Sequence, residues 1–307
     1  MYDIPILFVF FNRPEVVEES FNVLCKLKPK KLYLSCDGPR INNTSDRELI
    51  EKCRNSVLNR INWDCELHTR FLENNIGCSL GVSTAIDWMF ENEEYGIILE
   101  DDCIAGKDFF VFVSELLIQY KNDERIGMIA GYNQLKSYET DNSYVFSKYK
   151  ACWGWATWKR AWKNMDLSME WMNTGIKKST ILNNGYKGKD YRYWIYRIKL
   201  IKLKRVSAWD WQWYFSLAKN NQLCIFPKCN LISNIGFGEN STHTSGKCNE
   251  EYMVRGVIEF PLKHPDSVLP DFTFDRKFYK KNNSLYYRLV MLIPIDLKFF
   301  IKRIFGR

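Results

Sequence analysis

Three consecutive carboxylates, Glu100, Asp101 and Asp102, follow directly after the apolar run at residues 96–99. Unpaired negative charges repel one another and resist burial, so we expect a positive group to lie among them. Mg²⁺ and Mn²⁺ prefer oxygen ligands and commonly use one or two carboxylates together with the phosphates of a substrate. The triplet therefore predicts a divalent-cation site, although a surface turn with solvated acids would have the same sequence.

Three further segments place polar or flexible residues after apolar runs. In "FNRPE", Arg13 is a fixed cation near a helix start, where a diphosphate would bind. In "SCDGPR", Asp37 can accept hydrogen bonds from a base or ribose, and Gly38 lets the chain turn. In "NNIGCSLG", Gly77 and Gly81 permit close approach of a ligand to the backbone. Each is weak evidence alone, because an Asp-Gly pair is also an ordinary turn signal.

The first 130 residues alternate apolar runs with helical patterns, which predicts a mostly parallel sheet with helices on both faces. Ligands of such α/β sheets bind at the carboxyl ends of the strands, where all of these polar residues are expected to meet. The predicted strands cover residues 4–11, 31–36, 65–72, 96–100 and 126–130, and the predicted helices cover 13–27, 45–59, 80–91 and 107–120.

The chain is less regular after about residue 131. Residues 132–158 are turn-rich and aromatic, residues 159–206 are basic with a helical pattern, and residues 207–240 hold a dense aromatic stretch. We expect this half to form the acceptor side of a substrate cleft built on the sheet of the first half.

Composition narrows the class of protein. A chain of 307 residues with 46% hydrophobic content can bury a large core. The N-terminus shows neither a basic leader nor a long apolar run, so we expect a cytoplasmic protein. Ten cysteines without a CxxC pair or zinc-like spacing are expected to be reduced thiols rather than disulfides.

The net charge of +8 is unevenly distributed. Residues 159–205 carry 13 Lys and Arg against 3 Asp and Glu, and residues 276–307 carry 9 against 1. This pattern favours an anionic surface or substrate as partner, unless these are only solvated basic faces. The sequence contains no recognised nucleic-acid-reading module, so we expect no nucleic-acid partner.

The linear order of the motifs resembles that of a known group of enzymes. The chain carries in turn FNRPE, SCDGPR, NNIGCSLG, ILEDDCIAGKDFF, CWGWATWKRAW, WDWQWYFSLAKNNQLCIFP and GFGENSTHT. It resembles the nucleotide-sugar glycosyltransferases of the GT-A fold, and within them it is most similar to N-acetylglucosaminyltransferase I and to bacterial family 2-like, hemolysin-like transferases. The resemblance covers about residues 4 to 245. It implies a Rossmann-like GT-A domain with a nucleotide-sugar-binding half (1–130) and an acceptor-binding, catalytic half (131–245), followed by a basic, aromatic extension (246–307).

The resemblance also implies roles for individual residues. Asp102 corresponds to the direct ligand of Mn²⁺ or Mg²⁺, and His243 lies where many members keep a histidine near the metal or diphosphate, although it is as often an ordinary surface residue. The implied donor-binding residues are Asn12 and Arg13 at the diphosphate, Asp37 at the uracil, Gly77, Glu100 at the sugar hydroxyls, Asp101 at the ribose, and Trp153, Gly154 and Trp155 in the loop that lines the donor sugar and acceptor.

The catalytic base is the least direct assignment. The family pattern has two adjacent aspartates between tryptophans, with the second as base, whereas "WDWQW" contains only Asp210. An ungapped count back from "CIFP" places Trp211 at the position of the base. We choose Asp210 because no other carboxylate lies between Asp190 and Glu239. The alternative is an acid held among aromatic residues for structural reasons.

The function implied is inverting, metal-dependent transfer of a sugar from a nucleotide-diphosphate-sugar, with a UDP-sugar favoured, to a hydroxyl of a glycan acceptor. We expect a lipid-linked acceptor and a place in bacterial surface polysaccharide synthesis, such as capsule or O-antigen. A non-catalytic carbohydrate-binding or membrane-associated scaffold is the alternative. A nucleotidyltransferase would need a Gly-rich loop with Lys or Arg after the first strand, and "FNRPE" lacks it.

Two aromatic features leave alternatives open. Large aromatic residues are mostly buried, so we expect only two of the five tryptophans 153, 155, 209, 211 and 213 to line the cleft. The basic and aromatic residues of 276–307 suit a helix on the inner face of an anionic membrane, but an ordinary packed C-terminal helix has similar features.

Overall fold

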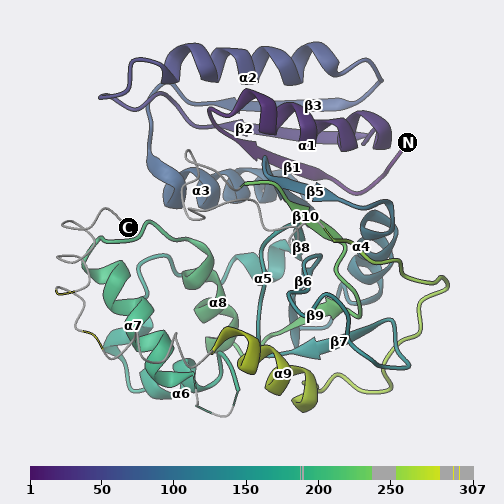
Figure 1. The fold of residues 1–307 in the computed structure, drawn as a ribbon, viewed down its shortest axis with the longest axis vertical. Helices are drawn as coiled ribbons and strands as arrows, with labels where there is room; N and C mark the ends of the chain where they lie inside the picture. The colour runs from purple at the N-terminus through teal and green to yellow at the C-terminus, as the bar shows by residue number, and fades with distance from the viewer. Residues whose placement is uncertain (187, 189, 237–253, 284–292, 294–296, 298–307) are drawn as a thin grey trace.

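A computed structural model describes residues 1–186, 188, 190–236, 254–283, 293 and 297 of the chain. At its centre lies an eight-stranded sheet of order β3-β2-β1-β4-β8-β6-β9-β7 (Figure 1). The strands are β1 (Ile6–Phe10), β2 (Lys31–Cys36), β3 (Glu66–Phe71), β4 (Tyr95–Glu100), β6 (Ile126–Ala130), β7 (Tyr144–Ser147), β8 (Trp155–Trp158) and β9 (Leu223–Pro227). Only β7 and β8 run against the other strands of this sheet, so the predicted mostly parallel α/β sheet is confirmed.

The helices of the first half lie within a few residues of the predicted ranges. They are α1 (Pro14–Leu27), α2 (Asp46–Arg60), α3 (Gly77–Asn92) and α4 (Lys107–Gln119). Pro14 opens α1 because its fixed φ and missing N–H suit the first turn of a helix. The one clear difference is α3, which begins at Gly77 rather than Leu80, because the Asp37 carboxylate accepts hydrogen bonds from the amides of Ile76 and Gly77.

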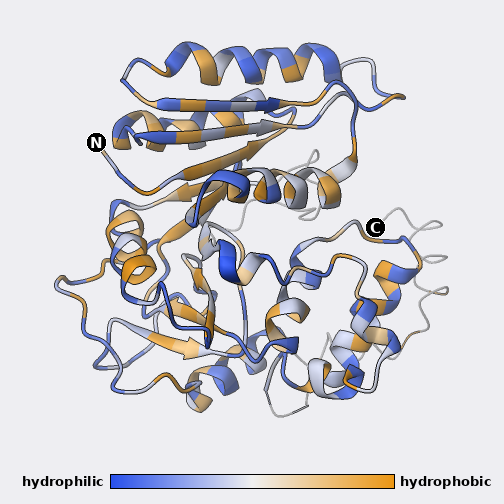
Figure 2. Ribbon diagram, turned by 180° about the vertical axis from the view of Figure 1, so that it is seen from behind, coloured by the Kyte–Doolittle hydropathy of each residue, from blue (hydrophilic) through white to orange (hydrophobic). Residues whose placement is uncertain are grey.

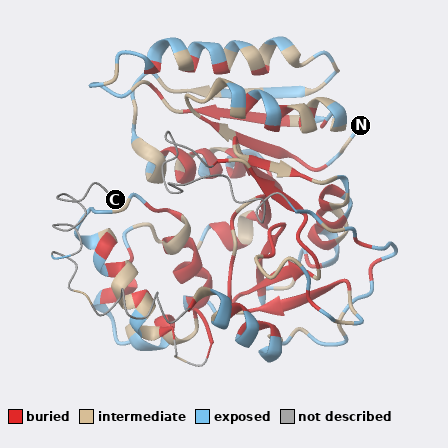
Figure 3. Ribbon diagram, in the orientation of Figure 1, coloured by how far each residue is buried: buried red, intermediate tan, exposed pale blue. Residues whose placement is uncertain are grey.

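The sheet is covered on both faces, as its apolar strands require. Along β1, Ile6 and Phe8 pack with α1, α2 and α4, whereas Leu7 points to the opposite face with residues of α3 and of the second half. Figure 3 shows the central strands buried and the edge strand β3 largely exposed. Hydrophobic residues are concentrated along the central strands, whereas the outer helix α2 is mostly hydrophilic (Figure 2).

The second half completes the same sheet instead of forming a separate layer. β8 inserts between β4 and β6, with Trp155 opposite Ile98 on one side and Ala130 on the other. The basic segment expected to be helical contains several short helices and one longer helix. The helices of this half are α5 (Lys159–Trp162), the 3₁₀ helix η1 (Glu170–Asn173), α6 (Lys177–Leu182), α7 (Tyr191–Lys202) and α8 (Asp210–Lys219), and the short strands β5 (Cys103–Ala105) and β10 (Ile232–Asn234) pair beside the main sheet.

The described part of the C-terminal extension packs onto the domain. Helix α9 (Phe272–Asn282) is capped by the side chain of Asp271, which accepts hydrogen bonds from the amides of Thr273 and Phe274. Phe274 and Phe278 are buried against Phe226. Beyond residue 283 only residues 293 and 297 are described, so most of the proposed membrane-binding segment lies outside them. No helix in the described residues has the length and apolarity to cross a membrane.

The described cysteines are free thiols, as predicted. Six of the nine are buried and none of the nine forms a disulfide, while Cys248 lies outside the described residues.

Candidate active site

The triplet Glu100, Asp101 and Asp102, hereafter the acidic strand end, lies where β4 leaves the sheet and turns into β5. β1 runs parallel to β4, so the residues after β1 lie beside this end. Arg13 is one of these residues. The strand order therefore brings together groups that are 87 or more positions apart in the sequence.

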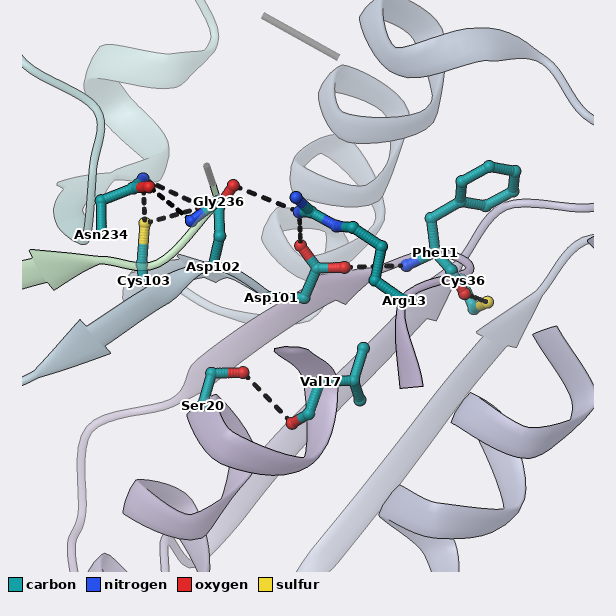
Figure 4. Close-up of polar contacts among 10 residues, drawn as sticks. All are labelled: Phe11, Arg13, Val17, Ser20, Cys36, Asp101, Asp102, Cys103, Asn234 and Gly236. Carbon is teal, nitrogen blue, oxygen red and sulfur yellow. Dashed lines mark hydrogen bonds and ion pairs between the residues drawn. The ribbon is translucent and has the colours of Figure 1, made fainter. Parts of the chain in front are cut away.

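Arg13 is the positive group among these carboxylates (Figure 4). Its Nη2 donates a hydrogen bond to Asp101 and another to Oδ2 of Asp102, at 3.1 Å. The amide of Phe11 also donates to Oδ2 of Asp101, at 3.3 Å. Asp101 is buried, so its charge depends on this pairing. The predicted cation site thus already contains a guanidinium.

One guanidinium does not balance three carboxylates. Burial, followed by the charges of Asp102 and Asp101, raises the pKa of Glu100 well above its ordinary range. Burial also raises the pKa of Asp101, and the Arg13 charge opposes that shift. The acidic strand end therefore disfavours the ionisation of all three carboxylates at once, and a bound cation would stabilise their ionised form.

Asp102 is oriented by the end of β10 and the residues that follow it. The Asn234 side chain donates from Nδ2 to Oδ1 of Asp102 at 3.2 Å, and the Gly236 amide donates to Oδ1 of Asn234 at 2.8 Å (Figure 4). A Cβ on Gly236 would lie 2.2 Å from Oδ2 of Asp102, so only glycine fits without moving that carboxylate. The sequence analysis did not identify Asn234, because a lone Asn in a turn-rich segment has no distinguishing pattern.

The donor set suits a cation that also binds substrate oxygens. No group of three His, Cys, Asp or Glu side chains arranged to hold a metal occurs among the described residues. The oxygen chemistry of the acidic strand end suits Mn²⁺ or Mg²⁺, but a cation there would need further ligands, such as diphosphate oxygens. His243 lies in the undescribed range 237–253.

Asp37 is held by the backbone at the second strand end. Its Oδ1 accepts from the amides of Gly38 and Ile76 at 2.8 and 3.0 Å, and its Oδ2 accepts from Gly77 at 3.0 Å. Gly77 has φ +84°, a left-handed conformation that favours glycine. Asp37 and Gly77 therefore stabilise the start of α3, and their predicted contact with the nucleotide stays a prediction.

Asn12 is held in a similar way. Its Nδ2 donates to Oδ1 of Asp46 at 2.8 Å. Arg40 pairs with the same carboxylate at 2.6 Å, and hydrogen bonds from Arg40 lower the pKa of Asp46 to about 2 despite its burial. In this structure the Asn12 side chain fastens the first strand end to α2, and its predicted role in donor binding stays a prediction.

A second centre, hereafter the aromatic cavity, lies at the start of α8. It is a cavity of about 330 Å³, and Asp210, Trp153 and Trp211 are among its lining residues. Asp210 is the first residue of α8. A cavity of this size with aromatic walls and a carboxylate can hold a single sugar unit.

The carboxylate of Asp210 has a pKa suited to proton transfer. Burial raises the pKa of Asp210 to about 6, although the amide of Trp211 and the charge of Arg197 partly oppose the shift. A base is most efficient when its pKa lies near the working pH while it remains largely ionised. At pH 7 Asp210 is thus mostly a carboxylate that can accept a proton from a hydroxyl group.

The two centres are neighbours. The charge of Asp210 contributes to the raised pKa of Glu100. The charges of Glu100 and Asp210 both act on the thiols of Cys78 and Cys152, whose pKa burial raises first of all. Asp210 therefore lies close enough to the acidic strand end for their charges to interact.

Of the predicted loop residues 153–155, only Trp153 lines the cavity. Trp153 also contacts the Tyr132 ring at 4.6 Å between centroids. Gly154 has φ +58° and packs so closely on Ile232 that a Cβ would lie 2.5 Å from Cδ1. The assignment of Trp155 to donor binding is wrong, because this residue is fully buried in β8 and stacks on Trp209.

Two of the five tryptophans line the aromatic cavity, the number expected for the substrate cleft, and the assignment of this cavity to the cleft stays a prediction. Trp153 and Trp211 line the aromatic cavity, whereas Trp155, Trp209 and Trp213 are at most 3% exposed. Sequence reasoning missed the polar floor of the cavity, where Lys150, Asn184 and Asp190 are buried. A buried lysine has no signal in a single sequence, since lysine is mostly exposed.

Comparisons with known proteins add little to this geometry. No protein-family model matches the chain, and no curated protein is detectably similar to it. Among solved structures, the chain is similar to HddC from Yersinia pseudotuberculosis complexed with GMP-PN (12% identity, 52% of this chain and 78% of that chain, TM-score 0.32). It is also similar to an apo UDP-glucose pyrophosphorylase (9%, 91% and 100%, 0.39) and to mannose-1-phosphate geranyltransferase from Thermus thermophilus (13%, 75% and 75%, 0.31). With TM-scores below 0.5, these similarities do not bear on the activity of this chain.

Proposed function

We propose that the chain is an inverting glycosyltransferase that moves a sugar from a nucleotide-diphosphate-sugar, preferably a UDP-sugar, to a hydroxyl of a glycan acceptor. The observation that carries this proposal is the placement of Asp210. The half-buried carboxylate of Asp210, with a pKa of about 6, lines a sugar-sized aromatic cavity, and its charge acts on an acidic strand end that pairs with an arginine. This combination of groups suits the two substrates of a glycosyl transfer.

In this proposal, the donor diphosphate lies near Arg13 at the start of α1. A guanidinium and a helix N-terminus both favour phosphate oxygens. Asp102 would be the protein ligand of Mn²⁺ or Mg²⁺, which supplies charge neutralisation for the departing diphosphate. The raised pKa of Glu100 supports a cation there, because a cation would stabilise the ionised carboxylates beside an anionic diphosphate.

The transfer is a single displacement. The bond between the anomeric carbon and the diphosphate oxygen breaks, and its electron pair leaves with the nucleoside diphosphate. The acceptor oxygen forms the new bond to the anomeric carbon from the opposite side, which inverts the configuration. Asp210 takes the proton of the acceptor hydroxyl, and general-base help of this kind contributes about 10²–10⁴-fold to a rate.

The choice of a glycosyltransferase over a nucleotidyltransferase rests on the first loop. Only Phe11, Asn12 and Arg13 connect β1 to α1, and none of them is glycine. A nucleotidyltransferase would need a longer Gly-rich loop there to surround the phosphates of a nucleoside triphosphate.

The acceptor we propose is a lipid-linked glycan of bacterial surface polysaccharide synthesis. The exposed residues Arg276, Lys277, Lys280 and Lys281 give α9 a basic outer face opposite Phe274 and Phe278. Such a face would favour an anionic membrane surface. Sedimentation with vesicles of phosphatidylglycerol, compared with phosphatidylcholine, tests this part separately.

The test of the activity is a panel of nucleotide sugars incubated with the chain, with and without Mn²⁺, followed by product analysis. Release of nucleoside diphosphate that depends on Mn²⁺ and rises with a glycan acceptor would support a glycosyltransferase. Formation of nucleoside triphosphate from a nucleotide sugar and pyrophosphate would instead identify a nucleotidyltransferase. Binding of a nucleotide sugar without either product would favour the non-catalytic scaffold, an alternative that the single aspartate of "WDWQW" keeps open.

A further inference from the structure

The floor of the aromatic cavity contains a lysine that no described carboxylate pairs with. Lys150 is only 6% exposed, and its Nζ donates one hydrogen bond, to Oδ1 of Asn184 at 2.9 Å. An ammonium group has three donors, and a buried charge without an opposite charge is costly. Among the described residues, Lys150 is therefore buried without an opposite charge, and it uses only one of its three N–H donors.

The nearby acids are already bound by other groups. Asp275 of α9 accepts from Oγ of Ser147 at 2.5 Å and from the amide of Lys148 at 3.5 Å. Burial lowers the pKa of Lys150 to about 7, and the opposing effects of Cys224 and Asp275 do not cancel it. Asp275 thus does not balance the positive charge of Lys150.

Asp190 also lines the cavity, and both of its carboxylate oxygens accept hydrogen bonds from other groups. One of its oxygens accepts from the Tyr149 hydroxyl and the Tyr186 amide, and the other accepts from Asn283 at 3.1 Å. With three donors around it, Asp190 has no need of Lys150, and no ion pair forms between them. A ligand in the cavity would meet Lys150 as an available cation.

Asn184 adds a second donor at the same place. It is 1% exposed and lines the cavity, and its Nδ2 has no hydrogen-bond partner among the described residues. Because Oδ1 accepts from Lys150, the amide orientation is fixed and Nδ2 is the free side. Buried donors are almost always satisfied in native proteins, so an unpaired one in a cavity wall indicates a missing acceptor.

We propose that the aromatic cavity is the acceptor subsite and that it selects a sugar with an anionic group, which pairs with Lys150 and Asn184. The assignment as acceptor subsite rests on the proposed glycosyl transfer, whereas selection of an anionic sugar rests on the cavity alone. Trp153 and Trp211 provide faces for the sugar ring, and Asp210 contacts its reacting hydroxyl. The anionic group is either the carboxylate of a sugar acid or the phosphate of a sugar phosphate.

The test is equilibrium binding of three probes to the full chain, namely methyl glucuronoside, glucose 1-phosphate and methyl glucoside. We expect at least one anionic probe to bind about tenfold or more tightly than the neutral one, because charge-assisted hydrogen bonds are strong. The better anionic probe identifies the source of the charge. Equal binding of all three probes would overturn the proposal.

Two substitutions assign the preference to this site. Lys150→Met keeps the length of the side chain, and we expect it to remove the preference for the anionic probe. Lys148→Met is the matched control, because Lys148 does not line the cavity, and the loss of its charge, which lowers the pKa of Lys150, should not reduce the preference. If Lys150→Met does not fold, Asn184→Asp supplies an internal carboxylate for Lys150 and should also remove the preference. A preference that survived either change would contradict the proposal.

The pH dependence and donor turnover separate the two proposals. Affinity for the anionic probe should fall as the pH rises above about 7, because Lys150 loses its proton, whereas affinity for the neutral probe should not. Release of nucleoside diphosphate without an acceptor reports on the transferase separately. Anion selectivity without donor turnover would support the anion site in the cavity and contradict the transferase. Donor turnover without anion selectivity would support the transferase and contradict the anion site.

Discussion

The acidic strand end and the aromatic cavity are neighbours, but Glu100 at the first and Lys150 at the second have side chains of opposite charge. At the acidic strand end, Arg13 pairs with Asp101 and Asp102, while burial and the charges of these two aspartates disfavour the ionised form of Glu100. In the floor of the aromatic cavity, Lys150 is a cation without an ion pair among the described residues. The difference supports the two proposals, in which a cation completes the first centre and an anion completes the second.

The largest effect should come from removing the base at the junction of the two centres. We expect Asp210→Asn to lower the transfer rate by about 10²–10⁴-fold, because the acceptor hydroxyl loses its proton acceptor. Donor binding at the acidic strand end should persist. The melting temperature at pH 7 should rise, because the folded state no longer holds an ionised carboxylate whose burial raises its pKa.

Calorimetric donor binding and initial rates of transfer measure these effects. Asp64→Asn is the control, since Asp64 is an exposed residue outside both centres. A wild-type transfer rate in Asp210→Asn would show that the base lies elsewhere.

A smaller effect is expected from a methyl group at the acidic strand end. In Gly236→Ala the new Cβ would lie 2.2 Å from Oδ2 of Asp102, so the carboxylate must move. A displacement of about 1 Å in an active site can reduce activity about 10²-fold, and we expect a loss of that order. Gly175→Ala is the matched control, because a Cβ there meets nothing within 4 Å. Initial rates of transfer measure this loss, and equal rates in the two variants would argue against a role for Asp102.

The pH profile should follow the ionisation of Asp210. With the pKa of Asp210 raised to about 6, transfer should fall about tenfold per pH unit below pH 6 and level off above it, since the base must be ionised. Rates at saturating donor from pH 4.5 to 8 measure this. A profile that stays level down to pH 5 would contradict the assignment of Asp210.

The smallest effect should come from the cavity wall. Trp211→Phe keeps an aromatic face, so we expect a several-fold rise in KM for the acceptor and little change in melting temperature. Trp209→Phe should lower the melting temperature and leave KM for the acceptor nearly unchanged, because Trp209 is 3% exposed and packs on Trp155. Thermal melting and acceptor titration of both variants measure the contrast. A similar loss of stability in both would mean that Trp211 is a core residue.

The sequence predicted the first half of the fold well, because local patterns decide it. Apolar strands such as Ile6–Phe10 and helices opened by residues such as Pro14 have signals that do not depend on distant contacts. The second half was less predictable. β8 inserts between β4 and β6, so its burial depends on strands that are distant in sequence, and this is why Trp155 was placed at the cleft rather than in the core.

The residues of the candidate site also differ in whether local sequence patterns identify them. Arg13 and the acidic triplet were found because they follow apolar strands, and their meeting was predictable from a parallel sheet. Lys150, Asn184 and Asn234 were not found, because only tertiary contacts distinguish them from ordinary polar residues. The backbone contacts of Asp37 likewise depend on a loop that is distant in sequence.

The central claim is that one centre binds the donor and the other performs the transfer. Its most direct test is to measure Mn²⁺-dependent donor binding and sugar transfer side by side for Asp102→Ala and Asp210→Asn. The account predicts that Asp102→Ala loses both donor binding and transfer, whereas Asp210→Asn keeps donor binding and loses transfer. Loss of donor binding in Asp210→Asn, or wild-type donor binding in Asp102→Ala, would contradict it.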